Sequence, residues 1–188
     1  MLPVTTINLQ NQFLIAMPQL EDPNFNGTIT YICQHNEDGA MGIIINRSSG
    51  INLGDIFEQL SFTTDGQHNE TPVSQGGPVQ LDRGFVLHND GSSWDSSYEV
   101  STSIQLTTSR DILEAIANNE GPEKFVIALG YAGWGAGQLE GEIAQNSWLT
   151  CASSEDILFH TDLGQKYDMA MASIGLDAAK LSTNAGHA

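Results

Sequence analysis

The apolar residues of this chain occur in short runs that glycine, asparagine and serine interrupt at frequent intervals. The longest runs, such as residues 42–45 and 125–129, fall far below the ~18 consecutive apolar residues that a membrane helix requires. Short runs bounded by turn-forming residues are typical of strands. We therefore expect a fold with a β-sheet at its centre and no transmembrane segment.

Several runs have the apolar or β-branched content of strands: residues 12–16, 28–35, 40–47, 83–88, 104–106 and 124–129. The tetrapeptide Asn-Glu-Asp-Gly at 36–39 predicts a hairpin turn, with Gly39 available for a positive φ. The run at 124–129 is apolar throughout, which indicates a buried central strand. The sheet is thus expected to begin with a hairpin and to continue around a central strand.

Apolar spacing predicts helices over residues 53–60, 137–145 and 163–174, and one further helix that ends at Asn118. Thr108 and Asp111 match a capping box that opens this further helix, and Gly175 stops the last one. Residues 61–71 are polar and are predicted to form a mobile loop. Hairpins followed by mixed strands and helices predict an α+β fold with a mixed sheet. No linker divides the chain, so residues 1–188 are expected to form a single domain.

The charge of the chain limits its partners. Six Lys and Arg residues against 23 Asp and Glu residues give a formal net charge of −17 over 188 residues. A field of this sign repels DNA, RNA and anionic lipid. It excludes a function that rests on a broad basic surface, so direct nucleic-acid binding and membrane association are not expected. A domain of this length can build its core without a metal or a disulfide.

The N-terminus and the cysteines indicate a compartment. The first basic residue is Arg47, so the positively charged segment of a signal peptide is not expected. Cys33 and Cys151 are too few and too far apart for a metal knuckle or a disulfide framework. Both are expected to be free thiols, and a cytoplasmic location is expected.

The common local signatures of catalysis are missing from the sequence. The chain has no phosphate-binding Gly-x₄-Gly-Lys-Ser/Thr loop, no Gly-x-Ser-x-Gly elbow, no His-Glu-x-x-His helix and no Cys-x-x-Cys pair. Catalytic residues could still assemble from distant positions. No catalytic residue, metal ligand or cofactor is therefore assigned.

The densest local signal runs from Gly130 to Glu142, after the buried strand and into the predicted helix at 137–145. Glycines at such a turn can present backbone N–H groups to a phosphate, but acidic residues in the first turns of the helix oppose an anion. We expect the chain to turn on Gly133, Gly135 and Gly137. Trp134 is expected to be mostly buried as a core residue, with a ligand platform as the alternative.

A ligand site, if the chain has one, is predicted from polar and aromatic residues that could converge on one pocket: Asn46, His88, Trp134, Gln138 and Glu142. Gln138 and Glu142 are four residues apart and share a helix face, for which a solvated surface is the alternative. His35 and His88 are each expected to be a structural histidine that makes hydrogen bonds, with a catalytic role as the alternative. Arg47 is expected to pair with a nearby carboxylate.

Several motifs occur together in a fixed order: residues 13–18 (FLIAMP), 22–25 (DPNF), 39–42 (GAMG) with 46–47 (NR), 76–79 (GGPV), 83–88 (RGFVLH) and 130–134 (GYAGW) with 137–140 (GQLE). They are similar to the signature blocks of the bacterial AlgH/YqgE family, from about Leu9 to the end of the chain. The resemblance implies a single α+β domain whose strongly curved mixed sheet forms a barrel-like body with helices outside. It also implies a bacterial, cytosolic protein.

The resemblance to this family implies no established enzyme activity and no cofactor. Some members carry a label of transcriptional regulation linked to alginate synthesis. This chain departs from the common pattern at Gln12, where the family often has His, at Ser48, where Pro is common, and at Tyr167, where Trp is usual. A role for the first-block His therefore cannot be transferred to this chain.

Three functions are compatible with these observations. The first is a non-enzymatic regulatory module that binds a protein partner or a small ligand. The second is an enzyme with an unrecognised site near the segment from Gly130 to Glu142. The third is a transcriptional regulator, for which direct DNA binding conflicts with the net charge of −17.

Overall fold

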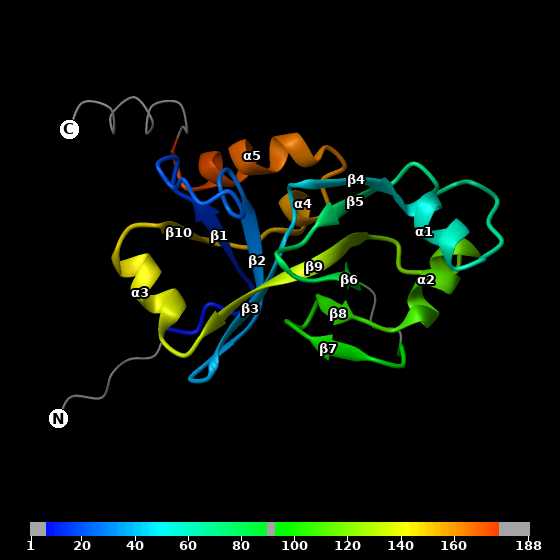
Figure 1. Ribbon diagram of the computed structural model, residues 1–188, viewed down its shortest axis with the longest axis horizontal. Coiled ribbons are helices and arrows are strands. Elements are labelled where there is room, and N and C mark those ends of the chain that lie inside the picture. Colours follow the sequence, from blue (N-terminus) through cyan, green and yellow to red (C-terminus); the bar gives the residue numbers. More distant parts are fainter. Residues whose placement is uncertain (1–6, 90–92, 177–188) are drawn as a thin grey trace.

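The computed structural model describes residues 7–89 and 93–176, and in this part of the chain strands outnumber helices (Figure 1). The strands are β1 Gln12–Ala16, β2 Ile29–Asn36, β3 Gly39–Ile44, β4 Ser48–Asn52, β5 Pro72–Gln75, β6 Val79–His88, β7 Ser97–Glu99, β8 Gln105–Thr107, β9 Phe125–Gly135 and β10 Trp148–Ala152. The helices are α1 Leu53–Gln59, α2 Arg110–Ala117, α3 Gln138–Ala144, α4 Glu155–Leu158 and α5 Lys166–Ser173, with a 3₁₀ turn at Leu163–Gln165.

The strands are connected in one curled sheet of half-barrel shape. Its order is β10-β1-β2-β3-β9-β6-β8-β7, and β4 and β5 join it beside β9. All strand pairs in this part of the chain are antiparallel except β5 with β9, which run parallel. The fold is therefore α+β with a curved, mixed sheet and helices outside it, as the sequence predicts.

The long central strand β9 connects the two halves of this sheet (Figure 1). Its first half pairs with β5 and β6, and its second half pairs with β3. Gly130 lies at the change of partner with φ +80°, and a Cβ there would lie 2.5 Å from the Gly77 carbonyl oxygen. Only glycine fits this bend without strain, which explains why an apolar strand continues into a glycine-rich segment.

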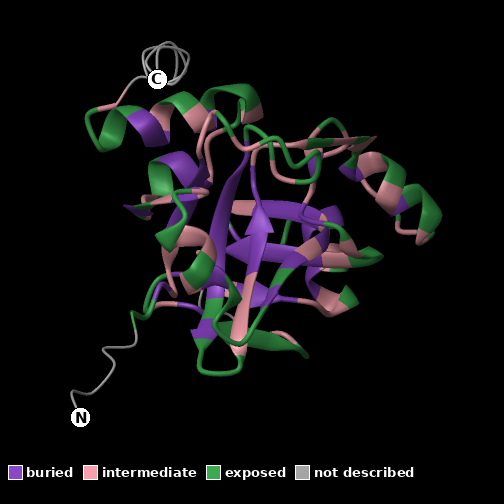
Figure 2. Cartoon of the chain, turned by 60° about the vertical axis from the view of Figure 1, so that its left-hand side comes forward, coloured by how far each residue is buried: buried purple, intermediate pink, exposed green. Residues whose placement is uncertain are grey.

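The core fills both faces of the sheet. One cluster packs around Phe13, Tyr31 and Phe85 and is covered by α4 and α5. A second joins Trp134 and Trp148 to α3, and a third packs α1 and α2 onto the first half of β9. Figure 2 shows the buried residues gathered on the central strands, whereas the outer helices expose one side.

The elements predicted from apolar spacing are confirmed, with corrections at their ends. Helix α2 has Ser109 as its N-cap, and no side chain makes a capping hydrogen bond there, so the predicted capping box of Thr108 and Asp111 is wrong. The Thr108 N–H donates instead to the Ser96 carbonyl. The apolar patterns of the sequence do not predict helix α4 or the strands β4, β5, β7 and β10. Residues 61–71 contain no strand or helix, and their mobility stays a prediction.

Candidate functional site

Three of the predicted site residues meet where β9 ends and α3 begins. Glu142 Oε1 accepts hydrogen bonds from the indole N–H groups of Trp134, at 3.3 Å, and of Trp148, at 3.1 Å. Gln138 donates to the other Glu142 oxygen at 3.2 Å and accepts the Gly135 backbone N–H at 2.9 Å. Phe25 stacks on Trp134, with ring centroids 6.0 Å apart. We call these five side chains and Gly135 the tryptophan cluster.

The tryptophan cluster is packed against itself. Trp134 is buried, with 6% of its surface exposed, so the prediction of burial is confirmed. The prediction that the chain turns on Gly133 and Gly135 is wrong, because both lie within β9 opposite β3. The turn is confined to the residues before α3, where Gly137 takes φ +73°. The side-chain oxygens of Glu142 and Gln138 are thus used to fix α3 on the sheet.

Asn46 and His88 lie away from this cluster. Asn46 follows β3 at the end opposite Gly39, where its side chain accepts the Ile29 N–H and donates to the Gly27 carbonyl. His88 pairs with Phe125 at the beginning of β9, is fully buried, and has Nε2 2.7 Å from the Thr107 hydroxyl. The predicted site residues therefore do not converge on one pocket.

Two further polar residues have structural partners. The Leu9 N–H donates to His35 Nδ1 at 3.0 Å, so Nε2 carries the proton of the neutral ring and donates to Glu140. The prediction of a hydrogen-bonded structural histidine is confirmed for His35. The prediction that Arg47 pairs with a carboxylate is wrong. Its guanidinium donates to the backbone carbonyls of residues 23, 24 and 26, because the preceding loop turns its carbonyls toward it.

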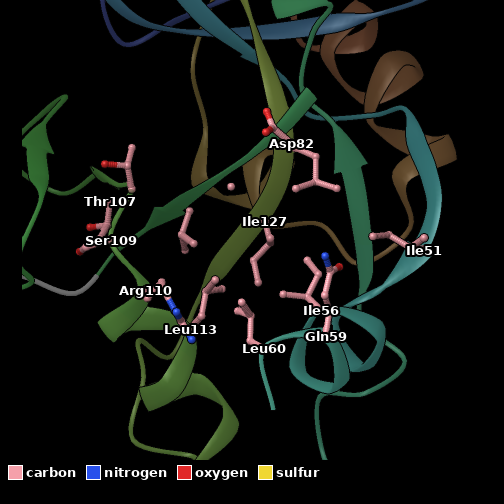
Figure 3. A pocket seen from close by; sticks show the side chains of 14 residues that line it. Ile51, Ile56, Gln59, Leu60, Asp82, Thr107, Ser109, Arg110, Leu113 and Ile127 are labelled. Atoms are coloured by element: carbon pink, nitrogen blue, oxygen red, sulfur yellow. The ribbon is translucent and has the colours of Figure 1, made fainter. Parts of the chain in front are cut away.

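A hollow of about 290 Å³ lies between α1 and α2, over β6 and the first half of β9 (Figure 3). We call it the α1–α2 cavity. Its apolar lining comes from Ile51, Ile56, Leu60, Val86, Leu113, Ile127 and Leu129. Its polar lining comes from Gln59, Asp82, Thr107, Thr108, Ser109 and Arg110. An apolar hollow with a few polar groups at its margin is the usual form of a small-molecule site.

The charges of this cavity lie at separate ends. Figure 3 places Asp82 at one end and Arg110 at the other, with Ile127 between them. Arg110 is the one basic residue among the lining residues, and its guanidinium lies 5.5 Å from the centre of the Phe62 ring. Such a cation–π contact holds the guanidinium near the margin without neutralising it.

The N-terminus of α2 has its own acceptor. Burial by itself raises the pKa of Asp111. Its carboxylate accepts hydrogen bonds from the Ser109 hydroxyl and from the backbone N–H groups of Asp95 and Ile112, and together these bonds outweigh burial and lower the pKa. The Asp111 carboxylate therefore stays charged and complements the helix dipole. Asp111 thus complements the N-terminus of α2, and Arg110 is the cationic side chain among the lining residues of the α1–α2 cavity.

Sequence reasoning missed this cavity. Apolar spacing predicts the inner faces of α1 and α2, but the lining residues come from four segments that are distant along the chain: 51–60, 82–86, 107–113 and 127–129. Within the described ranges, no group of three or more His, Cys, Asp or Glu side chains is placed to hold a metal ion. No helix of the described part is long and apolar enough to cross a membrane.

A family model described as AlgH-like matches residues 13–179. The chain belongs to the AlgH-like family. A UPF0301 protein of Thioalkalivibrio sulfidiphilus is 55% identical over 181 residues, which cover 96% of this chain and 97% of the relative. A UPF0301 protein of Hahella chejuensis is 53% identical over 180 residues, with 96% of each chain covered.

Solved structures that resemble this AlgH-like chain include a solution structure and a crystal structure. The solution structure of the AlgH protein from Pseudomonas aeruginosa has 46% sequence identity and a TM-score of 0.80, and the whole of both chains is covered. A crystal structure from Corynebacterium diphtheriae has 16% identity and a TM-score of 0.75, with 94% of this chain and 93% of that one covered. The first likeness supports the family and the fold, and the second supports the fold alone.

Proposed function

We propose that this AlgH-like protein is a non-enzymatic binding module and that its site is the α1–α2 cavity. The ligand is a small amphipathic molecule with one anionic group. The observation that carries the proposal is the position of Arg110 at the margin of an apolar hollow, in a protein that has six basic residues and 23 acidic ones. A lone cation beside an apolar wall favours an anion that also carries an apolar part.

The shape and charge of the cavity limit the ligand. A volume of about 290 Å³ is at the lower end of the ~300–1,000 Å³ usual for small-molecule sites. The apolar part of the ligand would lie against Ile56, Leu113 and Ile127. Its anionic group would lie at Arg110, since a guanidinium binds a carboxylate or phosphate with two parallel hydrogen bonds. Asp82 at the other end rejects a second anionic group.

This proposal is favoured over an enzyme with a site between Gly130 and Glu142. The Glu142 carboxylate accepts three hydrogen bonds from side chains of the tryptophan cluster. A carboxylate with these structural partners is less available as a proton-transfer group than a free one would be. No observation on the described residues favours direct DNA binding.

Titration calorimetry with octanoate as the probe tests the proposal. Octanoate supplies an apolar chain and one carboxylate, and octanol is the matched neutral probe. We expect the protein to bind octanoate more tightly than octanol. Arg110→Gln should weaken octanoate binding by about tenfold, because a hydrogen bond to a charged group contributes about 1.5 kcal/mol or more, and should leave octanol binding unchanged.

Arg83→Gln is the matched control. Arg83 is also exposed and also lies 5.5 Å from an aromatic ring, that of Phe85, but it does not line the α1–α2 cavity. The Arg83→Gln variant removes the same charge and the same kind of aromatic contact as Arg110→Gln. Because Arg83 does not line the α1–α2 cavity, this variant should not change octanoate binding. Equal weakening by both variants would show a general charge effect. That result, or no heat of binding for octanoate, would contradict the proposal.

A further inference from the structure

An open hollow of about 520 Å³ lies over β2, β3 and the second half of β9, which run side by side (Figure 1). We call it the Gly133 hollow. The strand register sets its floor, because Gln34 lies opposite Met41 and Met41 lies opposite Gly133. Residues that lie directly opposite one another in a sheet share a face. The hollow has no lining residue in common with the α1–α2 cavity, so its ligand chemistry is a separate question.

Gly133 is a glycine that the fold itself does not require. It lies inside β9, is exposed, and has a φ outside the left-handed region. A Cβ added there would lie 3.4 Å from Tyr131 Cε2, which is an ordinary van der Waals contact. At Gly76, by contrast, an added Cβ would lie 2.3 Å from the Gly130 carbonyl oxygen. Glycine weakens the interior of a strand, and one that no neighbour requires indicates a place where a ligand approaches the backbone closely.

A bulge in β6 brings polar side chains to the margin of this hollow. The four residues 80–83 of β6 lie opposite the single residue Gly130 of β9. Within the bulge Gln80 takes φ +50°, which costs free energy in a residue other than glycine. Bulges redirect side chains and are common beside functional sites. Here the bulge places Gln80 and Arg83 in the lining of the hollow.

Arg83 is the one charged side chain among the described lining residues of the Gly133 hollow. Its guanidinium lies 5.5 Å from the centre of the Phe85 ring and donates to Gln80 Oε1 at 3.3 Å. Phe85 in turn meets Tyr131 edge-on, with ring centroids 5.6 Å apart. Within the described residues no carboxylate forms an ion pair with Arg83, and the adjacent Asp82 lines the α1–α2 cavity. Most of the guanidinium's five N–H donors therefore remain for an anionic ligand.

We propose that the Gly133 hollow binds a planar aromatic carboxylate. The ring lies flat over Gly133, where the missing Cβ lets it reach the backbone, and its edges contact Met41 and Tyr131. The carboxylate lies at Arg83, since a planar guanidinium donates two parallel hydrogen bonds to a carboxylate. A puckered ring or a branched apolar group would be held away from the strand and would lose the close contacts on which dispersion attraction depends.

Chemical-shift titration of the full chain with 2-naphthoate tests this proposal, because the amides of each cavity report their own site. We expect saturable shifts at Gln34, Met41 and Gly133. Decahydro-2-naphthoate has the same carbon skeleton and charge but puckered rings, so it should bind several-fold more weakly at these amides. No saturable shift at these amides with 2-naphthoate, or equal affinity for the two probes, would overturn the proposal.

Two variants test the floor and the charge separately. Gly133→Ala adds a methyl group where the fold has room, so it should not lower the melting temperature. It should weaken 2-naphthoate binding at least several-fold, as followed at the Met41 amide. Arg83→Gln should weaken binding by about tenfold, because it removes the hydrogen bonds to the carboxylate. A large loss of stability in Gly133→Ala would show that the fold requires this glycine, and unchanged affinity in either variant would show that the ligand does not contact that residue; each result would overturn the proposal.

Gly84→Ala is the matched control for Gly133→Ala. Gly84 is also a strand glycine with room for a Cβ, but it lines the α1–α2 cavity. This variant and Arg110→Gln should leave 2-naphthoate binding at Met41 and Gly133 unchanged, and weakening by either equal to that by Gly133→Ala would contradict the proposal. Octanoate has no ring and should not shift the Gly133 amide. Failure to shift α1 and α2 thus counts against the proposed function, whereas failure to shift Gly133 counts against this proposal.

Discussion

Replacement of Trp134 by alanine tests whether the tryptophan cluster supports the fold or serves as a ligand platform. Trp134 is 6% exposed, stacks on Phe25, meets Trp148 edge-on at 6.1 Å between ring centroids, and donates to Glu142. Truncation leaves a cavity between β9 and α3 and removes one donor from a half-buried carboxylate. We expect a loss of about 3–5 kcal/mol in the free energy of unfolding.

The measurement is chemical denaturation followed by far-UV circular dichroism, which does not depend on the tryptophan that is removed. Trp134→Phe keeps most of the ring and removes only the indole N–H, so we expect a loss of about 1–2 kcal/mol. Gln138 lies on the exposed face of α3, and Gln138→Ala is the third variant. The sequence alone predicts less than about 0.5 kcal/mol for it, and its two hydrogen bonds in the structure raise the expectation to about 1 kcal/mol.

A loss below about 1 kcal/mol for Trp134→Ala would refute the structural interpretation. In that case the ring would contribute little to the fold, and the segment from Gly130 to Glu142 would become the leading candidate for a binding site. A loss in the expected range with an intermediate value for Trp134→Phe would show that ring volume, more than the hydrogen bond, holds α3 on the sheet.

Three further predictions follow from charge, burial and protonation. Cys33 and Cys151 are both free and buried, so thiol titration should count two thiols in unfolded, unreduced protein and fewer in native protein; a count of zero after unfolding would mean a disulfide. Duplex DNA should show no sub-micromolar, salt-sensitive shift with the pure protein, because the net charge is −17; such a shift would contradict this expectation. Burial lowers the pKa of Lys166 to about 7. Between about pH 7 and 10 the unfolded chain therefore holds a proton that the folded chain has lost. The free energy of unfolding then rises with pH, by at most about 1.4 kcal/mol per pH unit. The unfolding free energy of wild type minus that of Lys166→Met should therefore increase from about pH 7 to 9 in urea titrations; a constant difference would mean that Lys166 has an ordinary pKa.

The elements with a clear apolar pattern could be predicted from the sequence. The hairpin of β2 and β3 follows from two apolar runs and a turn at Gly39, which takes φ +139°. Strand β4 (SSGIN) could not be predicted, because it is polar and exists only through pairing with β5. The second half of β9 carries glycines that usually indicate a turn, and only its ladder with β3 keeps it extended.

The candidate site was harder to predict than the fold, because the α1–α2 cavity forms between segments that are distant in the sequence. Arg110 is the first residue of a predicted helix, and nothing in the sequence around it shows that it lines the same cavity as Ile51 and Ile127. Lys166 lies in a predicted helix, where a lysine is usually solvated, yet its side chain is fully buried and its Nζ donates to the Leu158 carbonyl at the end of α4. A single sequence carries no local signal for either arrangement.

Amide chemical-shift mapping with octanoate tests the central claim most directly, because it locates the ligand on the chain. The proposal predicts that shifts concentrate in α1, α2 and the facing part of β6, and that Arg110→Gln reduces them while Arg83→Gln does not. The tryptophan cluster, at the far end of β9, serves as the internal reference and should not shift. Shifts centred on α3 and Trp134, or no saturable shifts in α1 and α2, would contradict the claim that this AlgH-like protein binds ligands in the α1–α2 cavity.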